Sequence, residues 1–322
     1  MTARTLLIGL LLITVISLLT AISLGSVPLG WRTLGAVAMN HGTDLERALI
    51  LDVRLPRVIA AFTVGGLLAL AGTLMQVLLR NPLADPYILG VSGGAAVFVL
   101  TAMQLGLSGV GLTIAAFSGA LFTMILVFTL SRGKGSWNPT RLLLTGVVVA
   151  SGWSALIGFI LAISPDSGLK NMLFWLMGDL SFAGNALPAL ALLGAGLLLS
   201  LGIARDLNIL SRGELQALAL GVATGTLSLI IYALASLLTA SAVTLAGSVG
   251  FVGLIVPHLI RLMGVTDHRA LLPSSVLLGG SLVVAADTVA RTALAPQQLP
   301  VGIITALLGV PLFLFLLHRG AR

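Results

Sequence analysis

Residues 58–79 read VIAAFTVGGLLALAGTLMQVLL, an uncharged run whose apolar side chains would surround a helix on every side. An α-helix rises about 1.5 Å per residue, so this run is long enough to cross a hydrocarbon core of roughly 30 Å. The strands of a transmembrane barrel would be shorter, with apolar and polar residues alternating. The run therefore predicts a membrane-spanning helix.

The composition of the whole chain supports the same conclusion. Of its 322 residues, 58% are hydrophobic and only 8% are charged, and the mean hydropathy is +1.13. A soluble domain needs a more polar surface. Ten apolar stretches follow one another, at 5–27, 58–79, 88–105, 110–130, 142–163, 186–203, 223–243, 247–263, 271–289 and 301–317. We expect an all-α, polytopic membrane protein with about ten transmembrane helices in a single domain over residues 1–322.

The basic residues indicate how these helices are oriented. An even number of spans places both termini on one side, and cytoplasmic loops carry an excess of Lys and Arg. If the termini are cytoplasmic, that side has eleven basic residues: Arg4, Arg80, Arg132, Lys134, Arg141, Arg205, Arg212, Arg261, Arg269, Arg319 and Arg322. The other side has six: Arg32, Arg47, Arg54, Arg57, Lys170 and Arg291. The prediction is a multi-pass membrane protein with both termini in the cytoplasm.

Two other interpretations fit some of these features. The first stretch follows Arg4 as the apolar region of a signal peptide would, but it is longer than such a region and lacks a clear small-residue cleavage site. The net charge of +7 is compatible with nucleic-acid binding, but the basic residues stand singly at helix ends, as positive-inside topology requires. We expect the chain to be surrounded by membrane lipid and to bind no nucleic acid.

The sequence contains no site for ATP. Its only Gly-Lys pair, Gly133-Lys134, lacks the surrounding phosphate-binding loop of ATPases, and no segment is long or polar enough to be a soluble domain. Any ATP and magnesium must therefore be bound by a partner, and we expect no cofactor in this chain.

A first break in the helical pattern is RNPLADP at 80–86. Two prolines four residues apart forbid a continuous helix, so the chain should turn here on the cytoplasmic side. The next residues, LGVSGGA at 89–95, are small and allow helix backbones to approach closely. A tight turn followed by ordinary helix packing is enough to explain both segments.

A second cluster, RLPR at 54–57, stands where the helix over 58–79 should begin, because proline is favoured in a first helical turn. Arg54 and Arg57 would then oppose the helix macrodipole, and they lie on the side with fewer basic residues. These two penalties suggest an acidic partner. Anchoring of the guanidinium groups among lipid headgroups is an equally good explanation.

A third cluster, SRGE at 211–214, has the spacing of a capping box and predicts a short helix that stops at Gly221. Leu215, Leu218 and Ala219 would share one face. A helix of about two turns cannot span a membrane, but it can dock into a groove of a partner protein or lie on the membrane surface.

No motif indicates catalysis or a metal site. His258 and Arg261 lie one turn apart in GFVGLIVPHLIR at 250–261, but the four histidines are dispersed and no carboxylate cluster accompanies them. We therefore expect neither catalytic nor metal-binding residues.

Together these segments resemble the FecCD family of permeases, the membrane subunits of type II ABC importers for cobalamin, haem and ferric siderophores. The resemblance covers nearly the whole chain. Its motifs are RLPR at 54–57, NPLADP at 81–86, LGVSGGA at 89–95, GELQALALG at 213–221, GFVGLIVPHLIR at 250–261, DHRALLP at 267–273 and LPVGIITALLGVPLF at 299–313.

The resemblance implies the type II ABC importer fold and a set of partners. These are a second copy of the chain in a homodimer with the substrate path on its twofold axis, two cytoplasmic ATP-binding subunits and a periplasmic substrate-binding protein. Arg54, Arg57 and Arg291 would meet acidic side chains of the binding protein, although Arg291 follows Asp287 by four residues and could also pair with it.

The resemblance also assigns the cytoplasmic residues. Asn81 and Leu83 match one cytoplasmic gate, and Pro139 and Thr140 match a second, with proline where the cobalamin permease has a hydroxyl residue. The segment at about 206–222 matches the helices that couple to the ATPase, through Arg212, Glu214, Leu215, Leu218 and Gly221. Residues 169–180 resemble a short periplasmic helix that lines the outer gate.

The predicted function is a non-catalytic permease subunit that imports an iron chelate, haem or a ferric siderophore, by alternating access. Cobalamin is the alternative cargo within the same family. A secondary transporter driven by ions is a more distant alternative, since it would need an ionisable relay within the membrane and Asp287 is the only acidic residue well inside a late span. An intramembrane enzyme would need a converging catalytic set, which the sequence lacks.

Overall fold

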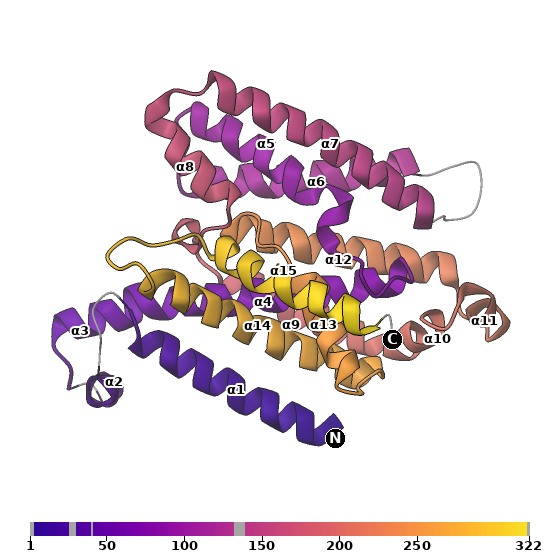
Figure 1. The fold of residues 1–322 in the computed structure, drawn as a ribbon, viewed down its shortest axis with the longest axis horizontal. Helices are drawn as coiled ribbons and strands as arrows, with labels where there is room; N and C mark the ends of the chain where they lie inside the picture. The colour runs from indigo at the N-terminus through magenta and orange to yellow at the C-terminus, as the bar shows by residue number, and fades with distance from the viewer. Residues whose placement is uncertain (1–2, 26–29, 40, 132–138, 321–322) are drawn as a thin grey trace.

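A computed structural model of the chain describes residues 3–25, 30–39, 41–131 and 139–320, and every regular element in this part is helical (Figure 1). The elements are α1 (Ala3–Ser23), α2 (Trp31–Ala38), α3 (Asp44–Ala48), η1 (Leu49–Arg54), α4 (Leu55–Leu78), η2 (Pro86–Leu89), α5 (Val91–Gln104), α6 (Val110–Ser131), α7 (Pro139–Ile163), α8 (Asp166–Leu176), η3 (Leu180–Phe182), α9 (Leu187–Gly202), α10 (Ala204–Leu210), α11 (Glu214–Ala219), α12 (Thr224–Ala246), α13 (Val252–Leu262), α14 (His268–Thr292) and α15 (Val301–Gly320). The predicted all-α class is confirmed.

Each of the ten predicted apolar stretches coincides with a helix: α1, α4, α5, α6, α7, α9, α12, α13, α14 and α15. Among the described residues, six helices are long and apolar enough to cross a membrane, and a seventh span is possible if α9 and α10, bent by 64°, count as one. The apolar parts of α5, α13 and α15 are shorter. Their full crossing stays a prediction.

Helix α4 is the centre of the molecule. Its side chains are buried on almost every side, because α9, α12, α13 and α14 all pack against it. Glycines allow this close approach: Gly65 lies against the backbone of Gly279 in α14, and Gly72 lies against Gly253 in α13. Lipid offers no hydrophobic force between helices, so such close van der Waals contact is a main source of helix association.

Helices α5 to α8 form a group on one side of the molecule, and α12 lies between this group and the helices around α4 (Figure 1). Tyr232 of α12 joins the two parts. Its ring stacks on Phe128 of α6 with centroids 5.6 Å apart, and its hydroxyl donates a hydrogen bond of 2.7 Å to the Met124 carbonyl oxygen. Outward faces of α6 and α7 carry exposed apolar side chains, as contact with lipid requires.

The two ends of the bundle differ. Helix α1 begins and α15 ends at the same end as α10 and α11, whereas α2 and α3 lie at the opposite end (Figure 1). This arrangement agrees with an even number of crossings. The end that contains α10 and α11 is called the α11 end, and the end that contains α2 and α3 is called the α3 end.

Irregular backbone within the bundle is hydrogen-bonded to other segments. Between α12 and α13 the Val249 N–H donates to the Tyr87 hydroxyl at 3.1 Å, and at the start of α15 the Gly302 N–H donates to the Gly178 carbonyl at 3.1 Å. Backbone polar groups at membrane depth must find such partners, because hydrocarbon supplies none. The first bond connects the segment before α13 to η2, and the second connects the start of α15 to the turn after α8.

The packing of α4 yields a stability prediction. A methyl group at position 72 would overlap the Gly253 backbone, so we expect Gly72→Ala to destabilise the protein by about 1–3 kcal/mol through forced separation of α4 and α13. The measurement is the Tm of the purified protein in detergent. Gly152→Ala in α7 is the matched control, since nothing lies within 4 Å of its added methyl group. Equal Tm values for the two variants would contradict this account of α4.

Candidate functional site

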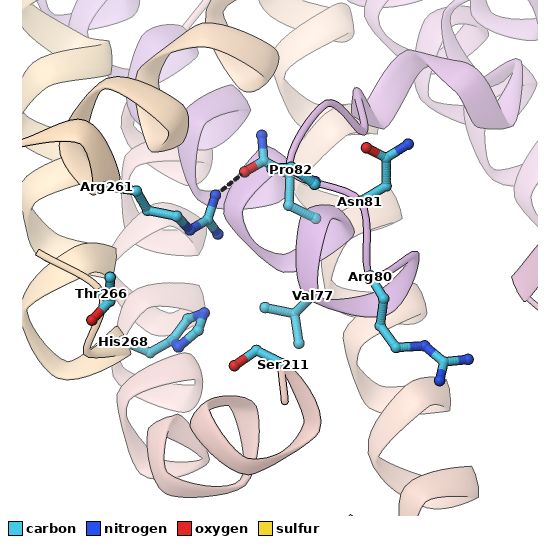
Figure 2. A pocket seen from close by; sticks show the side chains of 9 residues that line it. Val77, Arg80, Asn81, Pro82, Ser211, Arg261, Thr266 and His268 are labelled. Carbon is cyan, nitrogen blue, oxygen red and sulfur yellow. Dashed lines mark hydrogen bonds between the residues drawn. The ribbon is translucent and has the colours of Figure 1, made fainter. Parts of the chain in front are cut away.

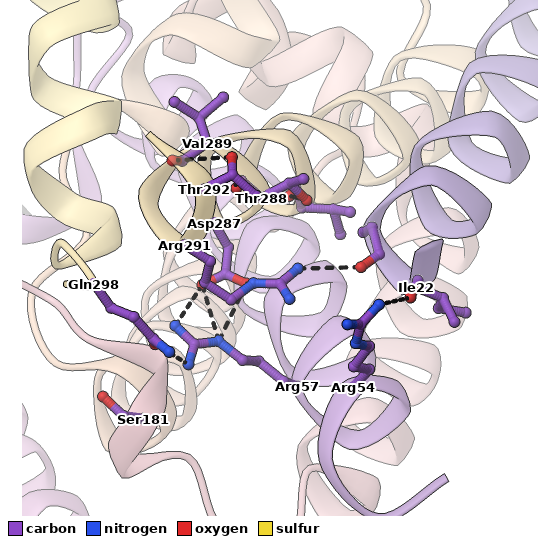
Figure 3. A network of polar contacts seen from close by, with 12 residues as sticks. Ile22, Arg54, Arg57, Ser181, Asp287, Thr288, Val289, Arg291, Thr292 and Gln298 are labelled. Carbon is purple, nitrogen blue, oxygen red and sulfur yellow. Dashed lines mark hydrogen bonds and ion pairs between the residues drawn. The ribbon is translucent and has the colours of Figure 1, made fainter. Parts of the chain in front are cut away.

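Two polar regions at opposite ends of the bundle contain the residues predicted to be functional. The first, at the α3 end, is an arginine cluster formed by Arg54, Arg57 and Arg291 around Asp287 (Figure 3). The Asp287 carboxylate is only 1% exposed and accepts hydrogen bonds from both neighbours, from Arg57 Nη2 at 2.9 Å and from Arg291 Nε at 2.9 Å. Arg57 also donates to the Gln298 side chain at 2.9 Å.

The same cluster holds the end of α1. Arg54 donates through Nη1 to the carbonyl oxygens of Ile22 and Ser23 at 2.7 and 2.8 Å, and Arg291 donates to the Ala21 carbonyl at 3.2 Å. The last carbonyls of a helix lack intrahelical partners and carry the negative end of its dipole, so cations are favourable there. The cluster thus connects α1, α4 and α14.

The expected start of the second helix requires a correction. Pro56 does lie in the first turn of α4, but the helical run begins at Asp44 and continues through α3 and the π-helical turn η1 into α4. Proline lacks an N–H and its ring crowds the preceding turn, and a wider π turn accommodates both effects. Arg54 and Arg57 therefore do not face an open helix N-terminus, and the dipole penalty that we expected for them does not arise.

Asp287 of this chain supplies an acidic group to Arg57. The ion pair of Arg291 with Asp287 is also present, as the spacing of four residues indicated. Docking of a binding protein by the three arginines stays a prediction. In this structure Arg54 and Arg291 are buried and bond to internal groups, while the Arg57 side chain is 15% exposed.

The second region, at the α11 end, is the predicted gate and coupling segment. Arg80 ends α4 in the left-handed conformation, with φ of 49°, and Asn81 then turns the chain by accepting a hydrogen bond of 2.9 Å from the Leu83 N–H. Asn and Asp side chains favour such turns because they bond to the backbone two residues on. The break predicted at 80–86 is confirmed, with Asn81 exposed and Leu83 half-buried.

Helix α11 is the short helix predicted after Gly213, and it stops before Gly221, whose φ of 79° only glycine adopts readily. The predicted capping box is wrong. The Ser211 hydroxyl donates back to the Asn208 carbonyl at 2.8 Å, and Gly213, with φ of 131°, separates it from the helix.

The exposed face of α11 is apolar. Leu215 is 84% exposed, Leu218 and Leu220 are also exposed, and Ala217 points inward. Arg212 is exposed beside them. Apolar side chains displayed on a helix at the end of a bundle are typical of a protein contact or a membrane surface.

An ion pair joins the gate loop to α11, a feature that the sequence did not indicate. Arg80 Nη2 lies 3.2 Å from Glu214 Oε2, with both side chains 37% exposed. Each residue stood in a recognised motif, but nothing in the spacing of 134 positions could show that they meet. The pair provides a direct polar connection between the turn after α4 and the start of α11.

The other predicted gate is partly outside the described residues. Helix α7 begins at Pro139, and Thr140 is exposed in its first turn. Residues 132–138 and the Pro139 side chain lie outside the described part of the structure. The short helix expected at 169–180 is present as α8, followed by η3.

Asn208 organises the junction between α10 and α14. Its amide Nδ2 donates to Asp267 at 2.8 Å, and its Oδ1 accepts from the His268 N–H at 3.0 Å. Asp267 is the N-cap of α14, and the bond from the Arg269 N–H, followed by that from Asn208, holds the pKa of its carboxyl below the usual range.

Proteins of known family resemble this chain in sequence and in structure. The model of the FecCD transport family matches residues 11–319. The hemin transport system permease protein HmuU of Yersinia pestis is 41% identical over 96% of this chain and 94% of its own length. The cobalamin import system permease protein BtuC of Halobacterium salinarum is 44% identical over 85% of this chain and 74% of its own length. A solved inward-facing structure described as a metal-chelate type ABC transporter superposes with a TM-score of 0.85 and 32% identity, over 99% of this chain and 100% of that chain.

The arginine cluster yields a prediction on stability. Asp287→Ala removes the carboxylate that Arg57 and Arg291 share, so we expect a loss of about 3–5 kcal/mol, because two guanidinium groups remain without a counter-ion. Thermal unfolding in detergent measures this loss. Asp52→Ala, an exposed carboxylate at the same end, should change the Tm little. A Tm for Asp287→Ala within error of the control would contradict the structural role of the cluster.

Proposed function

Since this chain belongs to the FecCD transport family and is the permease subunit of an ABC importer of the metal-chelate kind, we propose that its cargo is haem or a ferric siderophore. The chelate passes from the periplasm to the cytoplasm by alternating access. The observation that carries the choice of cargo is the likeness to the hemin permease, which extends over nearly the full length of both chains.

The proposal includes the partners that such a subunit needs. Two copies of the chain form the pore, two ATP-binding subunits dock at the α11 end and a substrate-binding protein docks at the α3 end. The α11 end is then cytoplasmic, in the inner membrane of a bacterium, in agreement with the excess of basic residues on that side. The exposed leucines of α11 support a docking role, since they present an apolar face to a partner groove.

In this mechanism the subunit has no catalytic residue of its own. ATP binding to the partner moves α11, and the Arg80–Glu214 ion pair transmits that movement to the turn at Asn81 and Leu83. Because the pair is exposed, its contribution to stability is only about 0–1 kcal/mol, so it can break and re-form as the gate moves.

Cobalamin is the second candidate cargo, favoured by the likeness to BtuC of Halobacterium salinarum. An ion-driven mechanism is disfavoured by the surroundings of Asp287. A coupling carboxylate must exchange its ion or proton during transport, whereas Asp287 is held between two arginines at 2.9 Å each.

Uptake into proteoliposomes tests the proposal. Vesicles that contain this subunit and its ATPase are supplied with the binding protein and with radiolabelled haem, a ferric siderophore or cobalamin, with ATP inside or absent. We expect accumulation of one iron chelate only when ATP and binding protein are both present. Accumulation of cobalamin alone would show that cobalamin, and not an iron chelate, is the cargo. Accumulation that follows an ion gradient without ATP would refute the ABC mechanism.

The exposed face of α11 gives a further prediction. Leu215→Asp should lower ATP-dependent uptake about fivefold or more, because a charge at the centre of an apolar contact weakens ATPase docking. The Tm of the subunit should not change, since Leu215 is 84% exposed. Co-purification with the ATPase measures docking directly.

The matched control is Leu45→Asp, which changes a leucine that is 70% exposed in α3, at the opposite end of the bundle. It should keep both ATPase docking and normal uptake into vesicles where the binding protein is saturating. Full docking of the Leu215→Asp variant would show that α11 is not the coupling helix.

A further inference from the structure

A cavity of about 260 Å³ lies at the α11 end, between the end of α4, the end of α13 and the start of α14 (Figure 2). It is lined by Gln76, Val77, Arg80, Asn81, Pro82, Ser211, Arg261, Thr266 and His268. Two of these residues are arginines and none is acidic. The lining is therefore basic, and it is built from three segments that are distant in the sequence, at 76–82, 211 and 261–268.

Arg261 is the first indication of a ligand. Its guanidinium donates to the Gln76 side-chain oxygen, and no carboxylate of the described residues pairs with it. Gln76 is in turn fixed, because its amide nitrogen donates to the Leu254 carbonyl at 3.1 Å. A half-buried guanidinium that has only a neutral partner gains most from an anion placed next to it.

His268 is the second, independent indication. The residue is 2% exposed, and its Nε2 atom has no hydrogen-bond partner among the described protein groups. The tautomer follows from the neighbours. Asn208 gives its Nδ2 hydrogens to Asp267, so its Oδ1 accepts the Nδ1–H of His268 at 2.7 Å. Nε2 of the neutral ring is then a bare acceptor, and Figure 2 shows the ring reaching into the cavity on the side of Arg261.

These two groups define the chemistry of the ligand. Arg261 requires a negatively charged oxygen, and Nε2 of His268 requires a hydroxyl that donates a proton in a hydrogen bond. A hydrogen phosphate group has both, whereas sulfate has only acceptor oxygens at neutral pH. The free Nδ2 hydrogens of Asn81, whose Oδ1 is used by Leu83, add a donor from the gate loop. Since one water occupies roughly 30 Å³, the cavity accommodates the group together with ordered waters.

We propose that this cavity binds a hydrogen phosphate group, with Arg261 on a charged oxygen and His268 Nε2 accepting from the hydroxyl. The group comes either from inorganic phosphate or from the monoester headgroup of phosphatidic acid. Its binding connects the end of α13 and the start of α14 to the turn at Asn81. Phosphate binding itself does not depend on the proposed cargo, whereas an effect of phosphate on uptake rests on the proposed function.

Titration calorimetry and thermal shift of the full-length subunit test the site, without ATPase or substrate. Inorganic phosphate is added to the protein in lipid-free detergent, with sulfate at equal ionic strength as the comparison anion. We expect phosphate to raise the Tm in a concentration-dependent manner and sulfate to bind about tenfold or more weakly. In a parallel arm the protein is placed in nanodiscs of phosphatidylcholine with or without phosphatidic acid. Stabilisation only by phosphatidic acid would identify the lipid as the source.

Three variants locate the binding. Arg261→Gln and His268→Gln should each weaken phosphate binding by about tenfold or more, since each removes one specified contact. Arg269→Gln, an exposed arginine one position beyond His268, should bind as the native chain does. If Arg261→Gln does not elute as a monodisperse species, His268→Gln decides the question.

Loss of phosphate preference over sulfate in His268→Gln supports the assigned role of Nε2. Equal binding of the two anions by the native chain would overturn it. The absence of any stabilisation by phosphate and by phosphatidic acid would overturn the site, while leaving the proposed import of iron chelates untouched.

Discussion

The structure depends on one constraint, the need to hold helices together in a solvent as apolar as their own side chains. Hydrophobic burial contributes little to association in lipid, so the contacts that remain are close backbone packing and hydrogen bonds. Gly65 and Gly72 place α4 directly on the backbones of α14 and α13. Because α4 is enclosed on almost every side, the helices around it take their positions from it.

The polar groups within the bundle follow the same constraint. Where the backbone leaves helical geometry, as between α12 and α13, a side chain or another backbone segment satisfies it. Charged residues at the α3 end form a compact set in which one carboxylate serves two guanidinium groups, and the remaining donors of Arg54 and Arg291 reach the last carbonyls of α1. These charged groups would be costly to expose to lipid, and their mutual contacts hold α1, α4 and α14 together.

Much of the fold could be predicted from the sequence, because the spacing of apolar stretches by turn residues is a strong one-dimensional signal. All ten stretches are helices, and the turn at Asn81 and the stop at Gly221 follow from local chemistry. The predictions that were wrong also concerned local structure. The capping box at Ser211 had the right spacing but the wrong backbone, since Gly213 intervenes. The helical turns before Arg54 were missed because charged residues such as Glu46, Arg47 and Asp52 interrupt their apolar ones.

The candidate site was predicted as a set of residues rather than as contacts. Arg57 and Asp287 are 230 positions apart, and Arg80 and Glu214 are 134 positions apart. The periodicity of a sequence does not indicate which residues pair over such separations. Asn208, which contacts both Asp267 and His268, lies in the segment at about 206–222, but nothing in the sequence indicated these contacts. Chemistry that depends on side chains from distant helices becomes visible only when the bundle is assembled.

The arginine cluster has a consequence for biosynthesis. Arg291 and the carbonyl that it binds are 270 positions apart, so α1, α3 and α4 have already left the ribosome long before α14 is made. Throughout that interval Arg57 has no carboxylate and the end of α1 has only part of its donors. The cluster is therefore completed only when a late helix is inserted, and a chain truncated before Asp287 lacks the carboxylate that pairs with Arg57.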